Sequence, residues 1–161
     1  YGSVLKMKIE PGRFIIGPAG TLLATVTNIT ETPAKRFVGL DTGFNHLVRP
    51  IMYGSYHRIV NASRMNGPTQ EVAVAGNICE SGDVFTRNLE NSTRTLGIPQ
   101  IGDCIAILDT GAYGLSMGSQ YNLRELPEEV LVSGGDAIVI RRRQTFKDLI
   151  QNFNWFDEKR F

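Results

Sequence analysis

The sequence has few cysteines and histidines, no excess of either charge and no long apolar run. Two Cys and two His among 161 residues predict neither a disulfide framework nor a cluster of metal ligands. Seventeen Lys and Arg against 16 Asp and Glu give a net charge of +1, so no electrostatic basis exists for binding nucleic acid or an anionic membrane. No apolar stretch approaches the ~20 residues of a spanning helix. The small number of cysteines and the lack of a secretory signal pattern both favour a cytoplasmic protein.

The residues that are present follow the pattern of short strands separated by turns. Alternating or wholly apolar segments occur at residues 22–29, 37–40, 56–62, 71–75, 105–108, 130–132 and 137–140. Turn residues separate several of them, at Thr32-Pro33, Asn66-Gly67-Pro68 and Gly134-Gly135. A weaker alternation over residues 4–9 indicates one more strand. The length suits one domain, and the regular turns predict an all-β barrel or sandwich.

One helix is predicted near the end of the chain. Its apolar positions follow helical spacing, at Phe146, Leu149, Ile150 and Phe153. Thr145 and Asp148 form a capping box at its start. We expect this apolar stripe to pack against other parts of the protein rather than to bind a cofactor. Residues 112–118 could form one further short helical turn.

Two Asp-Thr-Gly triplets, at Asp41 and Asp109, raise the possibility of an aspartic protease. Such an enzyme needs two carboxylates that share one proton. The triplets are only 68 residues apart, which is short for two complete lobes, and different residues precede each. Because Asp and Gly after a strand are also ordinary turn residues, the protease is the weaker interpretation.

Four segments hold residues of types that serve in binding or catalysis. In Glu10-Pro11-Gly12-Arg13, Pro and Gly fix a sharp bend between an acid and a base. Arg49 and Tyr53 could together hold a carboxylate. Cys79 stands beside Glu80 and Asp83, and nearby acids keep a proton on sulfur, which suits a proton donor rather than a thiolate nucleophile. Small residues between Asp109 and Tyr113 would allow a ligand to approach the backbone closely.

In this order, the segments resemble the C-terminal part of the fold-type III, pyridoxal-phosphate-dependent decarboxylases, and most closely the diaminopimelate decarboxylases. The matching stretches are EPGR from Glu10, LDTGFNHLVRPIMYGSYH from Leu40, GNICESGD from Gly76 and DTGAYGLSMGSQYN from Asp109. The resemblance implies a Greek-key, barrel-like β-domain of the alanine racemase/decarboxylase type with a short C-terminal helix. It also implies conversion of meso-2,6-diaminopimelate to L-lysine and carbon dioxide with pyridoxal 5'-phosphate as cofactor.

The resemblance also assigns roles to single residues. Glu10, with Pro11 and Gly12 in the same turn, would contact the cofactor, and Glu10 would keep its pyridine nitrogen protonated. Arg13 and Tyr113 would contact both cofactor and substrate. The distal carboxylate of the substrate would be held by Arg13, Arg49 and Tyr53. Cys79 would reprotonate the substrate Cα, and Glu80 would accept the distal ammonium. No residue is assigned to a metal.

Two further parts of the protein are implied. Cys79 and Glu80 act in the partner subunit's site in this family, so the resemblance predicts a homodimer with shared active sites. The family also has a (β/α)₈ barrel that carries the cofactor-binding lysine and a glycine-rich phosphate site. Residues 1–161 therefore correspond to the C-terminal β-domain, with the last barrel strand and the EPGR turn within residues 1–20. The start at Tyr1 inside a strand pattern looks like a cut, and we expect this part alone to be inactive.

Other functions remain open from the sequence. Relatives that decarboxylate D-lysine or D-ornithine have similar sequences but substrates without the second carboxylate. Ile51, Met52 and Ser55 depart from the residues expected around Tyr53. A non-catalytic β-barrel that serves only as a dimerisation module is the alternative from another class.

Overall fold

The computed structural model describes residues 5–87 and 92–153, and its main body is a strongly coiled β-sheet. The sheet has six strands in the order β3-β6-β1-β2-β4-β5. They are β1 (Thr21–Glu31), β2 (Arg36–Leu40), β3 (Ile59–Asn61), β4 (Thr69–Ala75), β5 (Arg94–Gly97) and β6 (Cys104–Leu108). The two outer strands approach each other, and the Nδ2 group of Asn61 donates a hydrogen bond to the carbonyl of Gly97 at 3.2 Å. The predicted all-β, barrel-like fold is confirmed.

Strand β1 is the centre of this sheet. It pairs antiparallel with β2 on one side and with β6 on the other. Its alternating residues Ala24 and Val26 are buried, as the period of two predicts. They pack with buried residues of the other strands, mainly Val38, Leu40, Val72, Val74, Ile105 and Ile107. The core therefore lies inside the coiled sheet.

The pairing of β3 and β4 could not be inferred from the turn between them. The turn at Asn66-Gly67-Pro68 does connect the two strands, but they are not partners. Strand β3 pairs with β6, whereas β4 runs parallel to β2 and antiparallel to β5. The short strand β5 and the helix α1 (Arg49–Tyr53) were not expected from the sequence.

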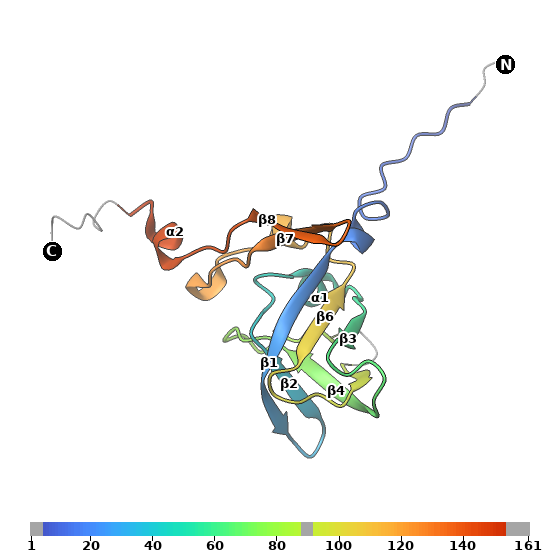
Figure 1. Ribbon diagram of the computed structural model, residues 1–161, viewed down its shortest axis with the longest axis vertical. Coiled ribbons are helices and arrows are strands. Elements are labelled where there is room, and N and C mark those ends of the chain that lie inside the picture. Colours follow the sequence, from blue (N-terminus) through green and yellow to red (C-terminus); the bar gives the residue numbers. More distant parts are fainter. Residues whose placement is uncertain (1–4, 88–91, 154–161) are drawn as a thin grey trace.

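A two-stranded hairpin, β7 (Glu129–Ser133) and β8 (Asp136–Arg141), lies beside the sheet (Figure 1). Gly134 and Gly135 have φ of 60° and 94°, and a two-residue turn of this kind matches the twist of the strands. This hairpin was predicted from the Gly-Gly pair. Its apolar side chains are 45–72% exposed, at Val130, Leu131, Val132, Ile138, Val139 and Ile140.

The C-terminal helix forms with the predicted cap but is shorter than its apolar stripe. Helix α2 covers Phe146–Ile150, and both hydrogen bonds of the capping box between Thr145 and Asp148 are present. Leu149 is buried, whereas Phe153 lies beyond the end of the helix in a turn. The short 3₁₀ turns η1 (Gly17–Ala19), η2 (Leu115–Met117) and η3 (Tyr121–Leu123) complete the described elements, and η2 confirms the helical turn expected in 112–118.

The strand expected at the beginning of the chain is not formed in the described residues. Residues 5–10 have no regular structure and extend away from the sheet (Figure 1). Leu5, Met7 and Ile9 are largely exposed. A strand needs a neighbour to pair its backbone groups, and this segment has none among the residues described here. None of the helices in the described ranges is long and apolar enough to cross a membrane.

Candidate functional site

Three of the four chemically interesting segments meet at one hollow of about 280 Å³. Arg13 and Phe14 reach it from the N-terminal turn, Arg49 from helix α1, and Asp109 from the end of β6. The lining also includes Gly17, Pro18, Tyr56 and His57. Two arginines, one aspartate and one histidine thus converge on a small concave surface. Such a surface is suited to a polar ligand that carries negative charge.

The turn that carries Arg13 is held against the loop that carries Tyr113. Gly12 lies so close to this tyrosine that an added Cβ would be 2.7 Å from its hydroxyl oxygen. A Cβ on Gly111 would be only 2.0 Å from the carbonyl oxygen of Ile16. The amide of Gly111 donates to the carbonyl of Gly17 at 3.0 Å. The Gly111 contact is between two stretches of backbone and only glycine permits it, and it holds the turn that carries Arg13 beside the loop that carries Tyr113.

Arg49 lies between two aromatic rings. Its guanidinium carbon is 5.1 Å from the centre of the Tyr53 ring and 5.4 Å from that of Tyr113. One Nη group donates to the hydroxyl of Ser55 at 3.4 Å. The Nε group is buried and has no hydrogen-bond partner in the part of the chain that is described. A guanidinium held flat with unused donors is a receptor for a planar anion such as a carboxylate.

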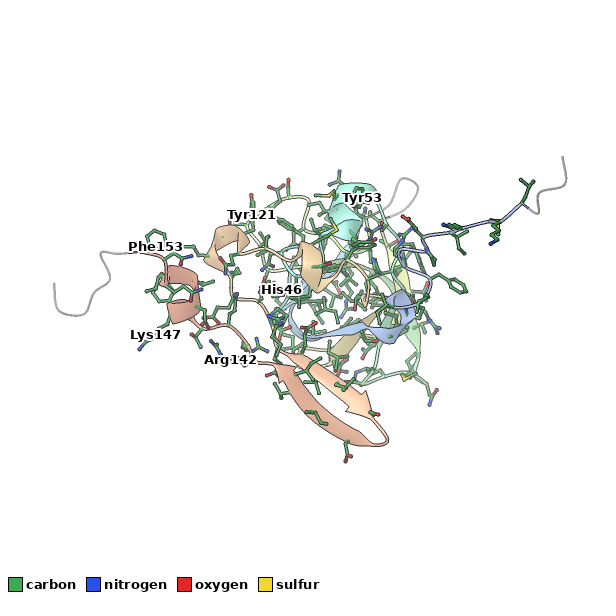
Figure 2. The ribbon with its side chains drawn as sticks, turned by 90° about the horizontal axis from the view of Figure 1, so that it is seen from above. His46, Tyr53, Tyr121, Arg142, Lys147 and Phe153 are labelled. Carbon is green, nitrogen blue, oxygen red and sulfur yellow. The ribbon has the colours of Figure 1, made fainter. Side chains whose placement is uncertain are left out.

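Helix α1 explains how Arg49 and Tyr53 come to the same face. Pro50 lies in the first turn, where its missing N–H is no loss, and Gly54 ends the helix in the left-handed conformation, with φ 61°. Residues four positions apart lie on one face of a helix, so Tyr53 stacks beneath the Arg49 side chain. Tyr53 itself is exposed on α1 (Figure 2).

His57 is a functional candidate that the sequence analysis missed. It is only 5% exposed, yet it lines the hollow. Its Nδ1 lies 3.0 Å from the carbonyl oxygen of Leu108, which can only accept, so Nδ1 carries the proton. Burial lowers the pKa of His57, and the neighbouring Arg49 and Arg13 act in the same direction. The ring is therefore neutral and offers the Nε2 lone pair as an acceptor. In the sequence it was weighed only as a metal ligand.

Asp109 and Tyr113 both have left-handed backbone conformations, with φ of 61° and 60°. Aspartate adopts this conformation fairly readily, whereas a tyrosine there is strained. The strain is localised where Tyr113 turns toward Gly12 and Arg49. This combination is typical of residues whose position serves a ligand rather than the fold.

Cys79 and Glu80 lie outside this hollow, at the exposed tip of a loop after β4. The Glu80 carboxylate accepts from the amide of Gly82 at 3.2 Å. Asp83 is not directed at the thiol as we expected. It is buried, and its carboxylate accepts from the amides of Phe44 and Ile78. Backbone amides thus bind the acid that was expected to hold the thiol proton.

Comparison with known proteins identifies the family to which this sheet belongs. Residues 13–111 match the family described as pyridoxal-dependent decarboxylase, C-terminal sheet domain. The chain belongs to this family. The Arg13 turn, α1 and the Asp109 loop begin within the matched region, so the hollow is a feature of a decarboxylase sheet domain.

Several proteins are similar to this sheet domain over most of its length. Diaminopimelate decarboxylase of Escherichia coli K12 is 46% identical over 92% of the chain and 37% of its own length. The same enzyme of Methanothermobacter thermautotrophicus is 48% identical over 92% of the chain and 33% of its own length. A crystal structure of diaminopimelate decarboxylase superposes with a TM-score of 0.84 and 46% identity, covering 93% of this chain and 37% of that one. The chain thus spans about a third of the length of these relatives.

The protease interpretation is wrong. The amide of Thr25 in β1 donates to the Asp41 carboxylate, and the Asp41 amide donates to the carbonyl of Thr25. Asp41 therefore lies on the side of β1 that pairs with β2. Asp109 follows Leu108, which pairs with Thr21 on the opposite side of β1. Four residues of strand separate the two positions by about 13 Å along β1. The two carboxylates cannot share a proton over that separation.

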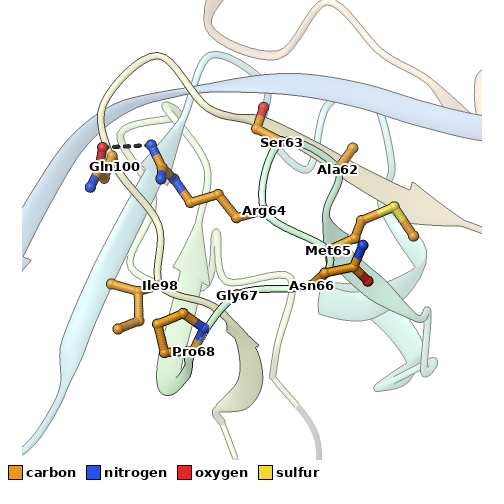
Figure 3. A pocket seen from close by; sticks show the side chains of 9 residues that line it. All are labelled: Ala62, Ser63, Arg64, Met65, Asn66, Gly67, Pro68, Ile98 and Gln100. Atoms are coloured by element: carbon orange, nitrogen blue, oxygen red, sulfur yellow. Dashed lines mark hydrogen bonds between the residues drawn. The ribbon is translucent and has the colours of Figure 1, made fainter.

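A larger hollow of about 640 Å³ lies under the loop between β3 and β4 (Figure 3). Its cation, Arg64, is already paired with Asp103 at 2.7 Å and donates to Gln100 at 2.5 Å. The remaining lining is mostly small or apolar. Within residues 5–87 and 92–153, no three His, Cys, Asp or Glu side chains are grouped as a metal ion would require.

Proposed function

We propose that the full-length protein is a pyridoxal-phosphate-dependent carboxy-lyase that converts meso-2,6-diaminopimelate to L-lysine and carbon dioxide. The observation that carries this proposal is the guanidinium of Arg49, whose Nε has no partner in the described residues and which lines the same hollow as Arg13. A substrate with a second, distal carboxylate gives these two cations a ligand, whereas D-lysine and D-ornithine do not. The names of the similar proteins support the same substrate.

In this proposal Arg13, Arg49 and Tyr53 bind the distal carboxylate. The two Arg side chains supply charge and paired N–H donors, and the exposed Tyr53 hydroxyl supplies one more donor. Asp109 partly offsets the two positive charges in the hollow. One net positive charge remains to match one carboxylate, because burial keeps His57 neutral. These residues orient the substrate and do not transform it.

The residues present suit a pyridoxal phosphate cofactor. The close approach of Gly12 to the Tyr113 hydroxyl places the EPGR turn against the Asp109 loop, so one bound group would contact both segments. Glu10, exposed at the start of this turn, would face the pyridine nitrogen, with Pro11, Gly12, Arg13 and Tyr113 along the ring edge. When bound, the cofactor supplies an electron sink for the charge left on Cα as carbon dioxide departs. An anionic carboxylate at the ring nitrogen favours the protonated ring and so a stronger sink.

The chain also supplies a proton donor and an amine acceptor. We propose that the Cys79 thiol delivers one proton to the substrate Cα and that Glu80 accepts the distal ammonium. Both are exposed, and neither lines the hollow of its own chain. Their position supports action in the site of a second copy, and therefore a homodimer with two shared sites.

The exposed apolar N-terminal segment supports a further contact in the full-length protein. We propose that a (β/α)₈ domain covers the N-terminal segment, where Leu5, Met7 and Phe14 are exposed. That domain would carry the cofactor-binding lysine, and residues 1–20 would include its last strand and the EPGR turn. Without it, residues 1–161 would be inactive. The two free cysteines support the cytoplasm as the compartment.

The test is carbon dioxide release by the full-length protein with pyridoxal phosphate added. We expect release mainly from meso-diaminopimelate, with D-lysine and D-ornithine far behind. Release mainly from D-lysine would retain the decarboxylase and refute the carboxylate-binding role of Arg13 and Arg49. Release from none of the three would favour a non-catalytic module. In the same assay Cys79→Ala should lower kcat by about 10²-fold or more while cofactor absorbance is retained.

A further inference from the structure

Asp83 joins the loop that carries Cys79 to the loop after β2. Its side chain is only 4% exposed. Oδ1 accepts from the amide of Phe44 at 2.8 Å, and Oδ2 accepts from the amide of Ile78 at 2.9 Å. Phe44 belongs to the loop after β2, whereas Ile78 directly precedes Cys79. One carboxylate therefore fixes the start of the Cys79 loop against a neighbouring loop of the barrel.

The backbone of the same loop closes around this carboxylate. The amide of Gly76 donates to the carbonyl of Asp83 at 2.9 Å, and the Asp83 amide donates to the carbonyl of Glu80 at 3.0 Å. A Cβ on Gly76 would lie 2.2 Å from Oδ2 of Asp83, and one on Gly43 would lie 2.5 Å from Cγ1 of Ile78 and 2.9 Å from Oδ2 of Asp83. Both positions favour glycine because the Asp83 carboxylate and the Ile78 side chain occupy the space beside them. The loop has little freedom to change its shape.

Fold stability does not account for the charge at this position. Burial raises the pKa of Asp83, although the two amide hydrogen bonds act against the shift. Glu80 lies near enough to raise it further. Asp103 is a contrasting case: burial also acts to raise its pKa, but hydrogen bonds from Arg64 and Asn61 outweigh burial and lower it. No cation pairs with Asp83 among the described residues. A buried carboxylate that lacks a cation is retained at a cost in stability.

We propose that Asp83 is a positioning residue, whose carboxylate fixes Ile78 and thereby holds Cys79 and Glu80 in the orientation that their chemistry requires. Ile78 is buried and anchored at its amide, so the next two side chains can only project outward from the loop tip. This inference rests on the proposed roles of Cys79 as proton donor and Glu80 as ammonium acceptor. It adds that their geometry depends on a residue that touches neither substrate nor cofactor.

The experiment compares Asp83→Asn with Asp103→Asn in the full-length enzyme. Both replace a buried aspartate that accepts at least two hydrogen bonds, so both should destabilise the fold. Asparagine keeps the shape, but its amide group would face a backbone N–H and could not accept from it. Two quantities are measured. One is kcat and KM for meso-diaminopimelate. The other is the rate of iodoacetamide alkylation of Cys79, followed on its peptide by mass spectrometry.

We expect Asp83→Asn to lower kcat by at least about tenfold, since a misplacement near 1 Å has effects of that size. The alkylation rate of Cys79 should change as well, whereas Asp103→Asn should leave both quantities within about twofold of wild type. The proposal is overturned if Asp83→Asn leaves both unchanged, or if Asp103→Asn changes them as much. If Asp83→Asn does not fold, Gly76→Ala replaces it, since the three atoms nearest its Cβ all belong to the Asp83 carboxyl group, which it would displace without removing the charge. An unchanged alkylation rate in that variant would equally overturn the proposal.

Failure of the underlying function gives a different result. If Cys79→Ala turns over like wild type, the proton-donor role of Cys79 is wrong, whatever Asp83 does. If Cys79→Ala is slow but Asp83→Asn is fully active with an unchanged alkylation rate, the donor stands and the positioning role is wrong. Alkylation reports the loop geometry even when no substrate is turned over.

Discussion

The guanidinium of Arg49 depends on two rings and one hydroxyl for its orientation. The stacking on Tyr53 and Tyr113 fixes the plane, and Ser55 takes one of the five donors. The buried Nε remains without a partner in the described chain. A ligand that accepts from Nε and one Nη would satisfy the group in the paired geometry that carboxylates favour.

We therefore predict that Arg49→Lys raises KM for meso-diaminopimelate by about 10- to 100-fold, since a hydrogen bond to a charged group is worth about 1.5–3 kcal/mol. Lysine keeps the charge but lacks the planar, paired donors. The value of kcat should change much less, because this group binds a part of the substrate that does not react. Steady-state kinetics over a range of substrate concentrations measures both.

Arg36→Lys is the matched control. The Nε of Arg36 is likewise buried without a hydrogen-bond partner in the described residues, its guanidinium pairs with Glu31 at 3.1 Å, and neither residue lines the hollow. We expect its KM to stay close to that of wild type. An unchanged KM in Arg49→Lys, or an equal rise in both variants, would contradict the carboxylate-binding role.

At the scale of elements, His46 connects the loop after β2 to the segment that leads into β7 (Figure 2). Its Nε2 donates to the carbonyl of Glu125 at 2.9 Å, so Nδ1 is the acceptor from the Thr42 hydroxyl at 2.7 Å. Burial lowers the pKa of His46. The bridge requires a neutral ring, because a protonated one could not accept from Thr42.

The pH dependence of stability follows from this shift. In the unfolded chain the pKa of His46 is about 6.5. Below that pH the unfolded chain binds a proton at His46 more readily than the folded chain does, so the free energy of unfolding falls as the pH is lowered. For His46 the slope can reach about 1.4 kcal/mol per pH unit. We predict that the urea midpoint of the full-length protein decreases between pH 7.5 and 5.5, and that His46→Gln reduces this decrease. A variant with the wild-type slope would show that His46 does not titrate in this range.

At the scale of the whole molecule, the hollow of one chain holds only one half of the proposed site. Arg49 lines the hollow, whereas Cys79 is exposed at a loop tip that does not. If each site combines Arg49 of one subunit with Cys79 of the other, Arg49→Ala and Cys79→Ala damage different halves of a shared site. A dimer formed from one subunit of each variant would contain one intact site.

We predict that, at a substrate concentration near the wild-type KM, the two variants are nearly inactive alone but regain activity when their subunits are exchanged. Equal amounts should give about a quarter of the wild-type rate, because half the dimers are mixed and each has one of two sites intact. The measurement is carbon dioxide release after co-expression with two different tags. Recovery of no activity in purified mixed dimers would place both residues in one subunit's site.

The sequence alone predicted most of the strands, though not β5, together with the Gly-Gly hairpin, the capping box and the candidate residues Arg13, Arg49, Tyr53 and Tyr113. These depend on local rules: the period of two, turn preferences and side-chain chemistry act within a few residues. The order of the motifs along the chain was enough to indicate the family, which the comparisons confirmed.

Only the tertiary structure decided which segments meet. The parallel pairing of β2 with β4, the separation of Asp41 from Asp109, and the inward turn of Asp83 all depend on contacts between residues far apart in the chain. Burial lowers the pKa of His57 and keeps its ring neutral, and a carbonyl 51 residues away fixes which ring nitrogen carries the proton. A side chain's type sets what it can do, but its pKa and its partners are fixed by the surroundings that the fold provides.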